Sequence, residues 1–264
     1  KCNFEIYYQL RKTKTIKYLS IFFIAFLTSC KSSDSKITAQ QIIDKTILYS
    51  GADKVKNSEI YFKFRDKEYF AYRENGNFKL IRKFDSITDG LTNDGFERFI
   101  NLEKQKLSKA DVSKYSNSVN SVHYFSVLPF GLNDKAVHKK QLQSSTVKGK
   151  EYYKIEVTFS KNGGGEDFED VFIYWIGKDD FLVDYLAYSY KTNGGGKRFR
   201  VLKEQCIKNG IRFVDYYNYK PLNENISLIN IDKAFENKEL KKVSEIVLKE
   251  IKVEEKFLNN LLVD

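Results

Sequence analysis

Four carboxylates crowd together in the second half of the chain: Glu166, Asp167, Glu169 and Asp170. Two carboxylates held close together could act as the acid and the nucleophile of a glycosidase, and a larger cluster could bind a cation. Cation-binding loops place their ligands at fixed, alternating spacing, and this cluster does not. We therefore expect a solvated charged rim. The alternative is a periplasmic or surface enzyme that uses this carboxylate-rich rim.

The carboxylates follow one of two glycine runs, Asn162–Gly165 and Asn193–Gly196. Glycine loops can bind phosphate, but neither run has the Lys-Ser/Thr ending or the following helix that a phosphate-binding loop requires. We expect two flexible hairpin turns at one end of a sheet. Lys197, Arg198 and Arg200 follow the second run, so charges of opposite sign could pair across neighbouring strands.

His123, His138 and Cys206 give weaker evidence of a functional site than the carboxylates do. His123 and His138 do not form a metal-binding motif, and zinc would need more ligands. Ser121 and Ser126 flank His123, but adjacency in sequence does not make a catalytic triad. We expect core or helix-surface histidines, no metal and no cofactor. Cys206 lies in a strand-like stretch, where we expect a small buried side chain.

The beginning of the chain has the pattern of a secretory signal. Basic residues between Arg11 and Lys17 precede the predominantly apolar run 18–27. As a helix this run would measure about 15 Å, half of a bilayer core of about 30 Å. The stretch Leu27-Thr28-Ser29-Cys30 resembles the lipobox of bacterial lipoproteins. That resemblance implies that Cys30 receives a diacylglyceryl group and anchors the protein in a membrane.

These features divide the chain into three parts. We expect a signal peptide in residues 1–29, an acylated cysteine and tether in residues 30–37, and a single β-rich domain in residues 38–264. The net charge of +10 falls to +6 without residues 1–29, which hold five basic residues and one acidic residue. Basic and acidic residues are interspersed, which argues against nucleic-acid binding. We expect a location in the cell envelope, at the outer membrane, and leave the oligomeric state open.

The elements expected in the first half begin with a helix. Thr38 and Gln41 form a capping box that opens a helix ending near Ser50. Apolar and polar residues alternate over 60–64, which predicts a strand, and Asn75-Gly76 predicts a hairpin between residues 69–73 and 78–84. With 18 Tyr, 21 Phe and only two Pro in the chain, the composition favours extended sheet.

A second helix is expected from Ser108 to about Leu128, and its apolar stripe must cover a sheet. After it we expect an antiparallel meander, with a covered strand at 171–176 that is apolar on both faces. The tail predicts a short helix near 232–240 and one strand around 245–253. The strands of the meander are expected at 151–160, 168–176, 181–190, 197–206 and 211–219.

Several segments resemble an uncharacterised family of Bacteroidetes lipoproteins, which carries only a domain-of-unknown-function label. They are Leu91–Asn101, Tyr115–Tyr124, Leu128–Asn133, Gly165–Trp175, Asp184–Tyr188 and Gly210–Tyr216. Membership would imply a lipidated envelope protein with no established activity. The order of elements is also similar to that of the LolA/LppX-like lipoprotein carriers, which hold acyl chains between a curved sheet and helices. The expected fold is therefore α+β, with a curved antiparallel β-sheet in an open half-barrel and covering helices.

The function that we expect is noncatalytic binding of a hydrophobic or amphiphilic ligand, such as a lipid, by an envelope lipoprotein. Aromatic side chains on strands that face a helix-covered concavity would line the site, although plain core packing is the alternative for each of them. A protein-interaction module of an envelope complex is a further alternative, and it predicts an exposed apolar patch of several hundred Å². The candidate ligand-binding residues are Tyr174, Trp175, Tyr185, Tyr188 and Phe213.

Overall fold

A computed structural model of the chain describes residues 37–162, 168–191 and 194–255. Cys30, Glu166 and Asp167 lie outside the described residues. The elements below belong to the compact unit that begins at Thr38. No helix in the described ranges is long and apolar enough to cross a membrane.

The two longer helices begin where the sequence predicts. The Thr38 hydroxyl accepts a hydrogen bond from the Gln41 backbone N–H, and the Gln41 side chain accepts one from Thr38 N–H, which confirms the capping box. Ser108 caps the second helix by accepting from Asp111 N–H. The helices of the described ranges are α2 (Ala39–Tyr49), η1 (Ala52–Asn57), α3 (Lys109–Ser126), η3 (Leu228–Asn230) and α4 (Ile231–Glu236).

The first sheet is antiparallel, in the order β15-β1-β2-β3-β4-β5-β6. Asn75 and Gly76 both have positive φ, 50° and 83°, and form the predicted hairpin turn. Strands β4 to β6 were not predicted, because Asp89 and Gly90 interrupt the apolar alternation there. The strands are β1 (Ser58–Phe64), β2 (Lys67–Glu74), β3 (Asn77–Phe84), β4 (Ile87–Thr92), β5 (Gly95–Ile100), β6 (Glu103–Lys104) and β15 (Leu248–Glu255).

The second sheet is also antiparallel, in the order β14-β13-β12-β11-β10-β9-β7, with β8 paired to β9. The five-strand meander predicted from residue 151 onward is confirmed as β9 to β13. Its register shifts between Leu202 and Glu204 and between Asn218 and Tyr219, and such bulges bend a sheet. The strands are β7 (Val137–Gln141), β8 (Ser145–Val147), β9 (Lys150–Phe159), β10 (Val171–Gly177), β11 (Val183–Tyr190), β12 (Gly196–Lys208), β13 (Ile211–Pro221) and β14 (Leu240–Ile246).

The tail differs from the prediction. The helix ends at Glu236, and the single strand expected around 245–253 is two strands, β14 and β15, separated only by Val247. Strand β14 pairs with β13 in the second sheet, whereas β15 pairs with β1 in the first. The structure therefore has two open antiparallel sheets instead of the expected single sheet, and the chain passes from the first to the second through α3 and returns to the first at Val247. Local alternation could not reveal this change of partner, because it depends on strands nearly 200 residues apart in sequence.

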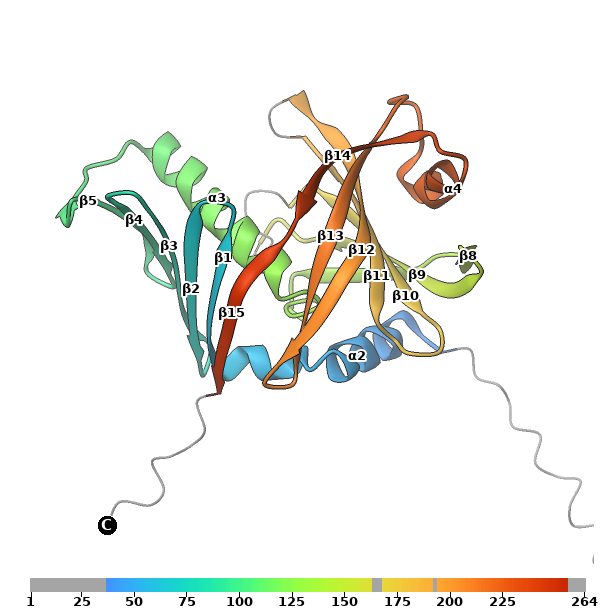
Figure 1. Ribbon diagram of the computed structural model, residues 1–264, viewed down its shortest axis with the longest axis horizontal. Helices are drawn as coiled ribbons and strands as arrows, with labels where there is room; N and C mark the ends of the chain where they lie inside the picture. The colour runs from blue at the N-terminus through green and yellow to red at the C-terminus, as the bar shows by residue number, and fades with distance from the viewer. Residues whose placement is uncertain (1–36, 163–167, 192–193, 256–264) are drawn as a thin grey trace, which may run out of the picture. The chain divides into compact units, whose positions relative to one another are not determined.

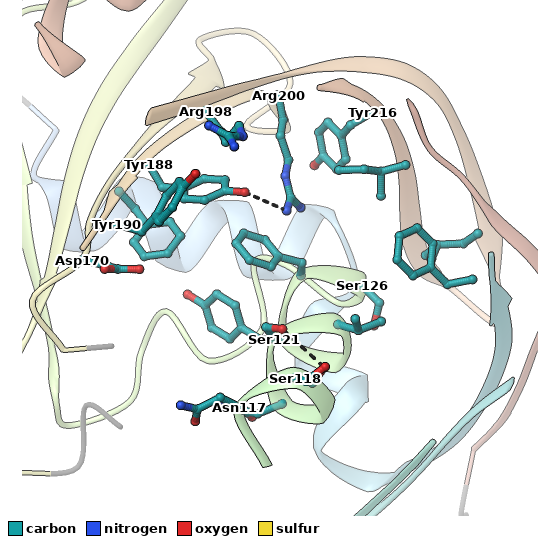
Figure 2. Close-up of a pocket in the computed structure, with 18 of the residues that line it drawn as sticks. Asn117, Ser118, Ser121, Ser126, Asp170, Tyr188, Tyr190, Arg198, Arg200 and Tyr216 are labelled. Atoms are coloured by element: carbon teal, nitrogen blue, oxygen red, sulfur yellow. Dashed lines mark hydrogen bonds between the residues drawn. The ribbon is translucent and has the colours of Figure 1, made fainter. Parts of the chain in front are cut away.

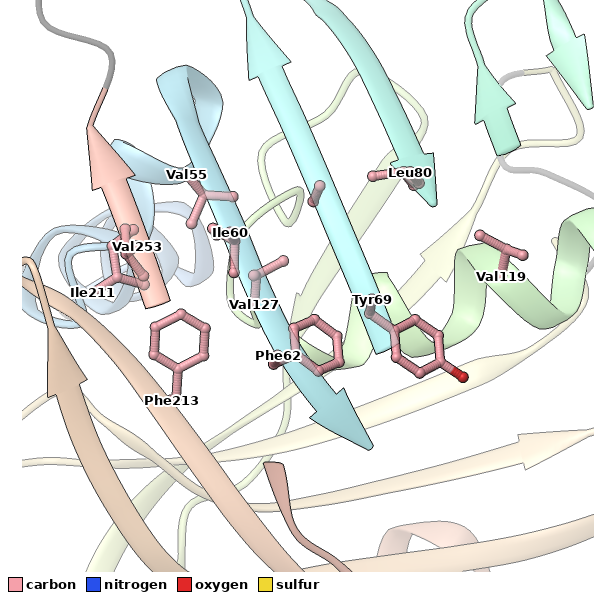
Figure 3. Packing of buried hydrophobic residues seen from close by; sticks show 11 residues of the cluster. Val55, Ile60, Phe62, Tyr69, Leu80, Val119, Val127, Ile211, Phe213 and Val253 are labelled. Atoms are coloured by element: carbon pink, nitrogen blue, oxygen red, sulfur yellow. The ribbon is translucent and has the colours of Figure 1, made fainter. Parts of the chain in front are cut away.

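Helix α3 lies between the two sheets (Figure 1). On the first sheet it buries Val119 among Phe62, Tyr69 and Leu80, which form one hydrophobic core (Figure 3). Phe213 of the second sheet closes this core from the other side. The prediction that this helix covers a sheet is confirmed.

Helix α4 covers the opposite face of the second sheet. Ile173 and Trp175 of β10 pack there in a second core with Ile231 and Ala234 of α4. Strand β10 is therefore covered on both faces, as predicted from its continuous apolar sequence. Cys206 is a correction: it is exposed, because it lies in the last five residues of β12, 204–208, which are all exposed.

Candidate functional site

A cavity of about 820 Å³ lies between α3 and the face of the second sheet that turns away from α4 (Figure 2). It is lined by α3 and by residues of β9 to β15, together with Phe64 of β1. Because β14 and β15 form part of its wall, the cavity is built where the chain passes from one sheet to the other.

Much of the cavity face of α3 is small and polar, while Val122, Tyr124 and Phe125 line the cavity near the end of the helix. Ala110, Ser113, Asn117 and Ser121 recur at three- or four-residue spacing and line the cavity, while Val119 packs on the first sheet. Short side chains on this face leave the space that larger residues would fill. Ala110 and Ser121 are exposed, so this side of the cavity opens to solvent.

One wall of the cavity is aromatic. The ring centroids of Phe125, Phe172 and Tyr188 lie 5.3 to 6.0 Å apart, and Phe159 lies 5.7 Å from Phe172. Such separations are those of favourable aromatic pairs. This group fixes the end of α3 against β10 and β11.

The other wall is aliphatic and aromatic. Its apolar side chains come from the region where β13, β14, β15 and β1 meet, and they are Phe64, Val214, Ile246 and Leu248. Val214 is 8% exposed. These two walls are apolar, whereas the α3 face and the charged residues near them give the rest of the cavity a polar lining.

Arg200 is a buried charged residue of this lining. Its side chain reaches from β12 towards the end of α3 (Figure 2), and the residue is only 8% exposed. The guanidinium carbon lies 3.8 Å from the ring centroid of Phe125, and Nη2 donates a hydrogen bond to the Tyr188 hydroxyl at 3.3 Å. Burial raises the pKa of the neighbouring Tyr216 to about 12, so that phenol is protonated at neutral pH.

The five residues predicted to bind a ligand divide among four places. Tyr188 lines the cavity. Tyr174 is fully buried on the same strand face as Phe172, with its hydroxyl 3.5 Å from that of Tyr124. Trp175 and Tyr185 belong to the core under α4, and Phe213 belongs to the core of the first sheet.

Sequence reasoning missed Arg200, Phe125 and Phe172 as cavity residues. A signal was present for Arg200, because it stands between two apolar residues, Phe199 and Val201, in a predicted strand. The alternation of β12 places Arg198 and Arg200 on one face and Phe199 on the other.

The carboxylate rim is only partly described. Glu169 is exposed and pairs with Lys191 at 3.1 Å, so charges of opposite sign do meet near the two glycine runs. Asp170 is 9% exposed and lines the cavity. Among the described lining residues it is the one carboxylate, and it accompanies Lys114, Arg198 and Arg200.

His123 belongs to the core. Its Nε2 lies 3.1 Å from the carbonyl oxygen of Ile81, to which it donates, and burial lowers the pKa of the imidazole to about 3. The hydroxyls of Ser121 and Ser126 donate to backbone carbonyls instead of to this ring. His138 is exposed, and its Nε2 forms a hydrogen bond of 2.6 Å with the Ser160 hydroxyl. No group of three or more His, Cys, Asp or Glu in the described ranges is placed to hold a metal ion.

Three solved structures illustrate what this chain is similar to. A DUF1329 family protein from Desulfovibrio piger has 11% identity and a TM-score of 0.51, over 83% of this chain and 95% of the other. A LolA superfamily protein from Nitrosomonas europaea has 12% identity and a TM-score of 0.41, over 83% and 92%. The lipoprotein LppX from Mycobacterium tuberculosis has 11% identity and a TM-score of 0.27, over 59% and 90%.

The similarity to the Desulfovibrio protein supports the fold of mostly antiparallel, open sheets with few helices. No curated protein matches the sequence. The model of the family of unknown function DUF6503 matches residues 16–248, which is most of the chain. The chain therefore belongs to the DUF6503 family.

Proposed function

We propose that the protein binds the apolar part of a hydrophobic or amphiphilic ligand in the cavity between α3 and the second sheet. The observation that carries this proposal is the cavity itself, with its volume of about 820 Å³ and its apolar walls. Sites for small molecules commonly measure about 300–1,000 Å³ and are lined mainly by apolar and aromatic side chains with a few polar groups.

The residues of α3 support a binding role. Val119 of α3 packs on the first sheet, whereas the cavity face of the helix carries short side chains at Ala110, Ser113, Asn117 and Ser121. A helix that only covered the second sheet would gain stability from larger apolar residues there. A ligand can supply that apolar contact instead, at about 0.8 kcal/mol for each buried methylene.

An enzyme with paired carboxylates is less well supported. Asp170 is the one carboxylate among the described lining residues, and Glu169 is exposed and ion-paired. A glycosidase needs a second carboxylate across the scissile bond. The described part of the site therefore favours binding.

We test the proposed function by filling the cavity with a larger side chain. Ser121→Trp places a large side chain at the cavity mouth, and Ser144→Trp makes the same change at an exposed serine between β7 and β8 that does not line the cavity. The neutral probe N-phenylnaphthylamine should show enhanced fluorescence with the wild type and with Ser144→Trp. Binding by Ser121→Trp should be about tenfold weaker or more, because the probe loses much of its apolar contact. Equal binding by all three proteins would disprove the proposal.

We also propose that residues 1–29 act as a signal peptide and that Cys30 carries the acyl anchor, with the protein at the outer membrane. The charged and apolar leader and the lipobox-like stretch before Cys30 support this proposal. Cells fed an alkyne fatty acid should label the wild type and fail to label Cys30→Ala, while Cys206→Ala should still be labelled. Labelling of Cys30→Ala at the wild-type level would refute the anchor.

A further inference from the structure

We infer that the cavity selects amphiphiles with an anionic head group, a carboxylate or a phosphate, and that Arg200 binds that head group. This inference rests on the proposed function and adds the charge of the ligand to it. It begins from the electrostatics of Arg200.

Arg200 has no counterion in the described part of the chain. It is 8% exposed, and no carboxylate of those residues forms an ion pair with it, although the buried Arg82, Arg98 and Arg212 each have one. Among the described residues the buried Arg73 also has none, but it does not line the cavity. Removing a charge from water without pairing it is costly, so proteins seldom retain such a group without a use.

The guanidinium also has donors to spare. Its hydrogen bond within the described residues is the one to Tyr188, and its buried Nε has no partner. Five residues in the described ranges contain a buried side-chain atom without a hydrogen-bond partner, and among these only Arg200 lines the cavity. Since an arginine carries five N–H donors, several remain for a ligand.

The surroundings hold the guanidinium in place. Phe125 lies at 3.8 Å from its carbon and Tyr188 at 5.3 Å, so two aromatic rings restrict its position. Arg198 lies two residues earlier on the same strand face, and its guanidinium contacts Tyr190 at 5.2 Å. With Lys114 at the opening, the described lining carries three cations and one carboxylate.

This geometry points to a head group rather than to an isolated ion. An oxyanion bound by Arg200 would lie between the aromatic wall and the wall of Phe64, Val214, Ile246 and Leu248. A free ion would leave those walls unoccupied, whereas the chain of an amphiphile would cover them. Charge-assisted hydrogen bonds from arginine suit carboxylates and phosphates equally well.

The experiment compares two probes that differ only in charge, dansylaminoundecanoic acid and its methyl ester. The wild type should bind the acid on the order of tenfold more tightly or better, because only the acid forms charge-assisted hydrogen bonds. In Arg200→Met the affinity for the acid should fall to that for the ester, with ester binding unchanged. Arg200→Lys should retain part of the preference. Lys79→Met removes an exposed positive charge from the first sheet and should leave the preference intact.

The outcomes separate the two proposals. If the wild type binds acid and ester equally, the inference fails while the proposed function stands. If neither probe binds, the proposed function fails. Competition with hexadecyl phosphate and with inorganic phosphate distinguishes the source of the anion. Inorganic phosphate that displaced the acid as well as hexadecyl phosphate did would overturn the amphiphile assignment.

Discussion

The indole N–H of Trp175 donates a hydrogen bond to the Asp232 carboxylate at 3.1 Å, and this contact joins β10 to α4. Lys154 pairs with the same carboxylate at 3.2 Å and donates to the carbonyl of Ile229 at 2.6 Å. All three side chains are nearly inaccessible to solvent. This buried group lies on the face of the second sheet that α4 covers. The cavity lies on the other face.

Asp232→Asn should destabilise the protein by about 3–5 kcal/mol, because Lys154 then remains buried without its anion. Trp175 is the single tryptophan, so its fluorescence reports urea unfolding at this position. Asp179→Asn, at an exposed turn, is the control and should leave the midpoint unchanged. A wild-type midpoint for Asp232→Asn would show that the ion pair does not stabilise the fold.

Substitution of Asp89 should destabilise the protein about as much as substitution of Asp232. Asp89 is inaccessible to solvent and accepts hydrogen bonds from Arg82 at 2.6 Å and from Arg98 at 2.6 Å. Arg82 also donates to Ser118 of α3 at 2.6 Å, so the group holds the helix on the first sheet. Asp89→Asn should lower the free energy of unfolding by about 3–5 kcal/mol. Amide hydrogen exchange in α3 should be faster in this variant than in the wild type.

The control for Asp89 is Asp94→Asn, in the exposed turn between β4 and β5. Both the unfolding midpoint and the exchange of α3 should match the wild type in this variant. If the amide hydrogens of α3 exchange as slowly in Asp89→Asn as in the wild type, the helix is held on the sheet by its apolar contacts alone.

Stability should fall in acid because of His123. Burial lowers the pKa of its imidazole from 6.5 to about 3, and the charge of Arg73 adds to this effect. As the pH falls below 6.5, the unfolded chain binds a proton that the folded protein does not, so unfolding becomes easier. The free energy of unfolding should decrease by about 1.4 kcal/mol per pH unit between roughly pH 6 and pH 3 through this residue.

Urea unfolding of His123→Gln across this range checks the prediction. The amide does not titrate, so the variant should lose less stability in acid than the wild type. His138→Gln removes the exposed histidine and should retain the wild-type loss. Parallel pH profiles for the wild type and His123→Gln would contradict the assignment.

Arg200→Met should raise the melting temperature of the ligand-free protein. The substitution removes a buried charge that has no ion-pair partner in ranges 37–162, 168–191 and 194–255, and it retains apolar contact with Phe125. A gain of about 1 kcal/mol would correspond to a rise of about 2–4 °C for a domain of this size. Differential scanning calorimetry measures it. Arg82→Met, in contrast, should lower the melting temperature, because Asp89 loses one of its two partners. A lower melting temperature for both variants would indicate that Arg200 serves the fold instead of a ligand.

Local sequence was sufficient for elements that depend on neighbouring residues. The Thr38 capping box, the Asn75-Gly76 turn and the strand at 171–176 were all predicted, because caps, turns and alternation act over a few residues. The candidate site was harder to predict. Alternation distinguishes the two faces of a strand, but it does not say which face an inserted helix will leave uncovered.

The sequence by itself determined an aromatic, antiparallel fold with two longer helices, a short third one and a meander, since composition and periodicity are properties of the chain alone. Tertiary structure decided that the tail crosses between sheets at Val247, that Trp175 packs under α4, and that Arg200 lies in the cavity with no ion-pair partner among the described residues. Each of these depends on which distant residues come together, and no local pattern encodes such long-range pairing.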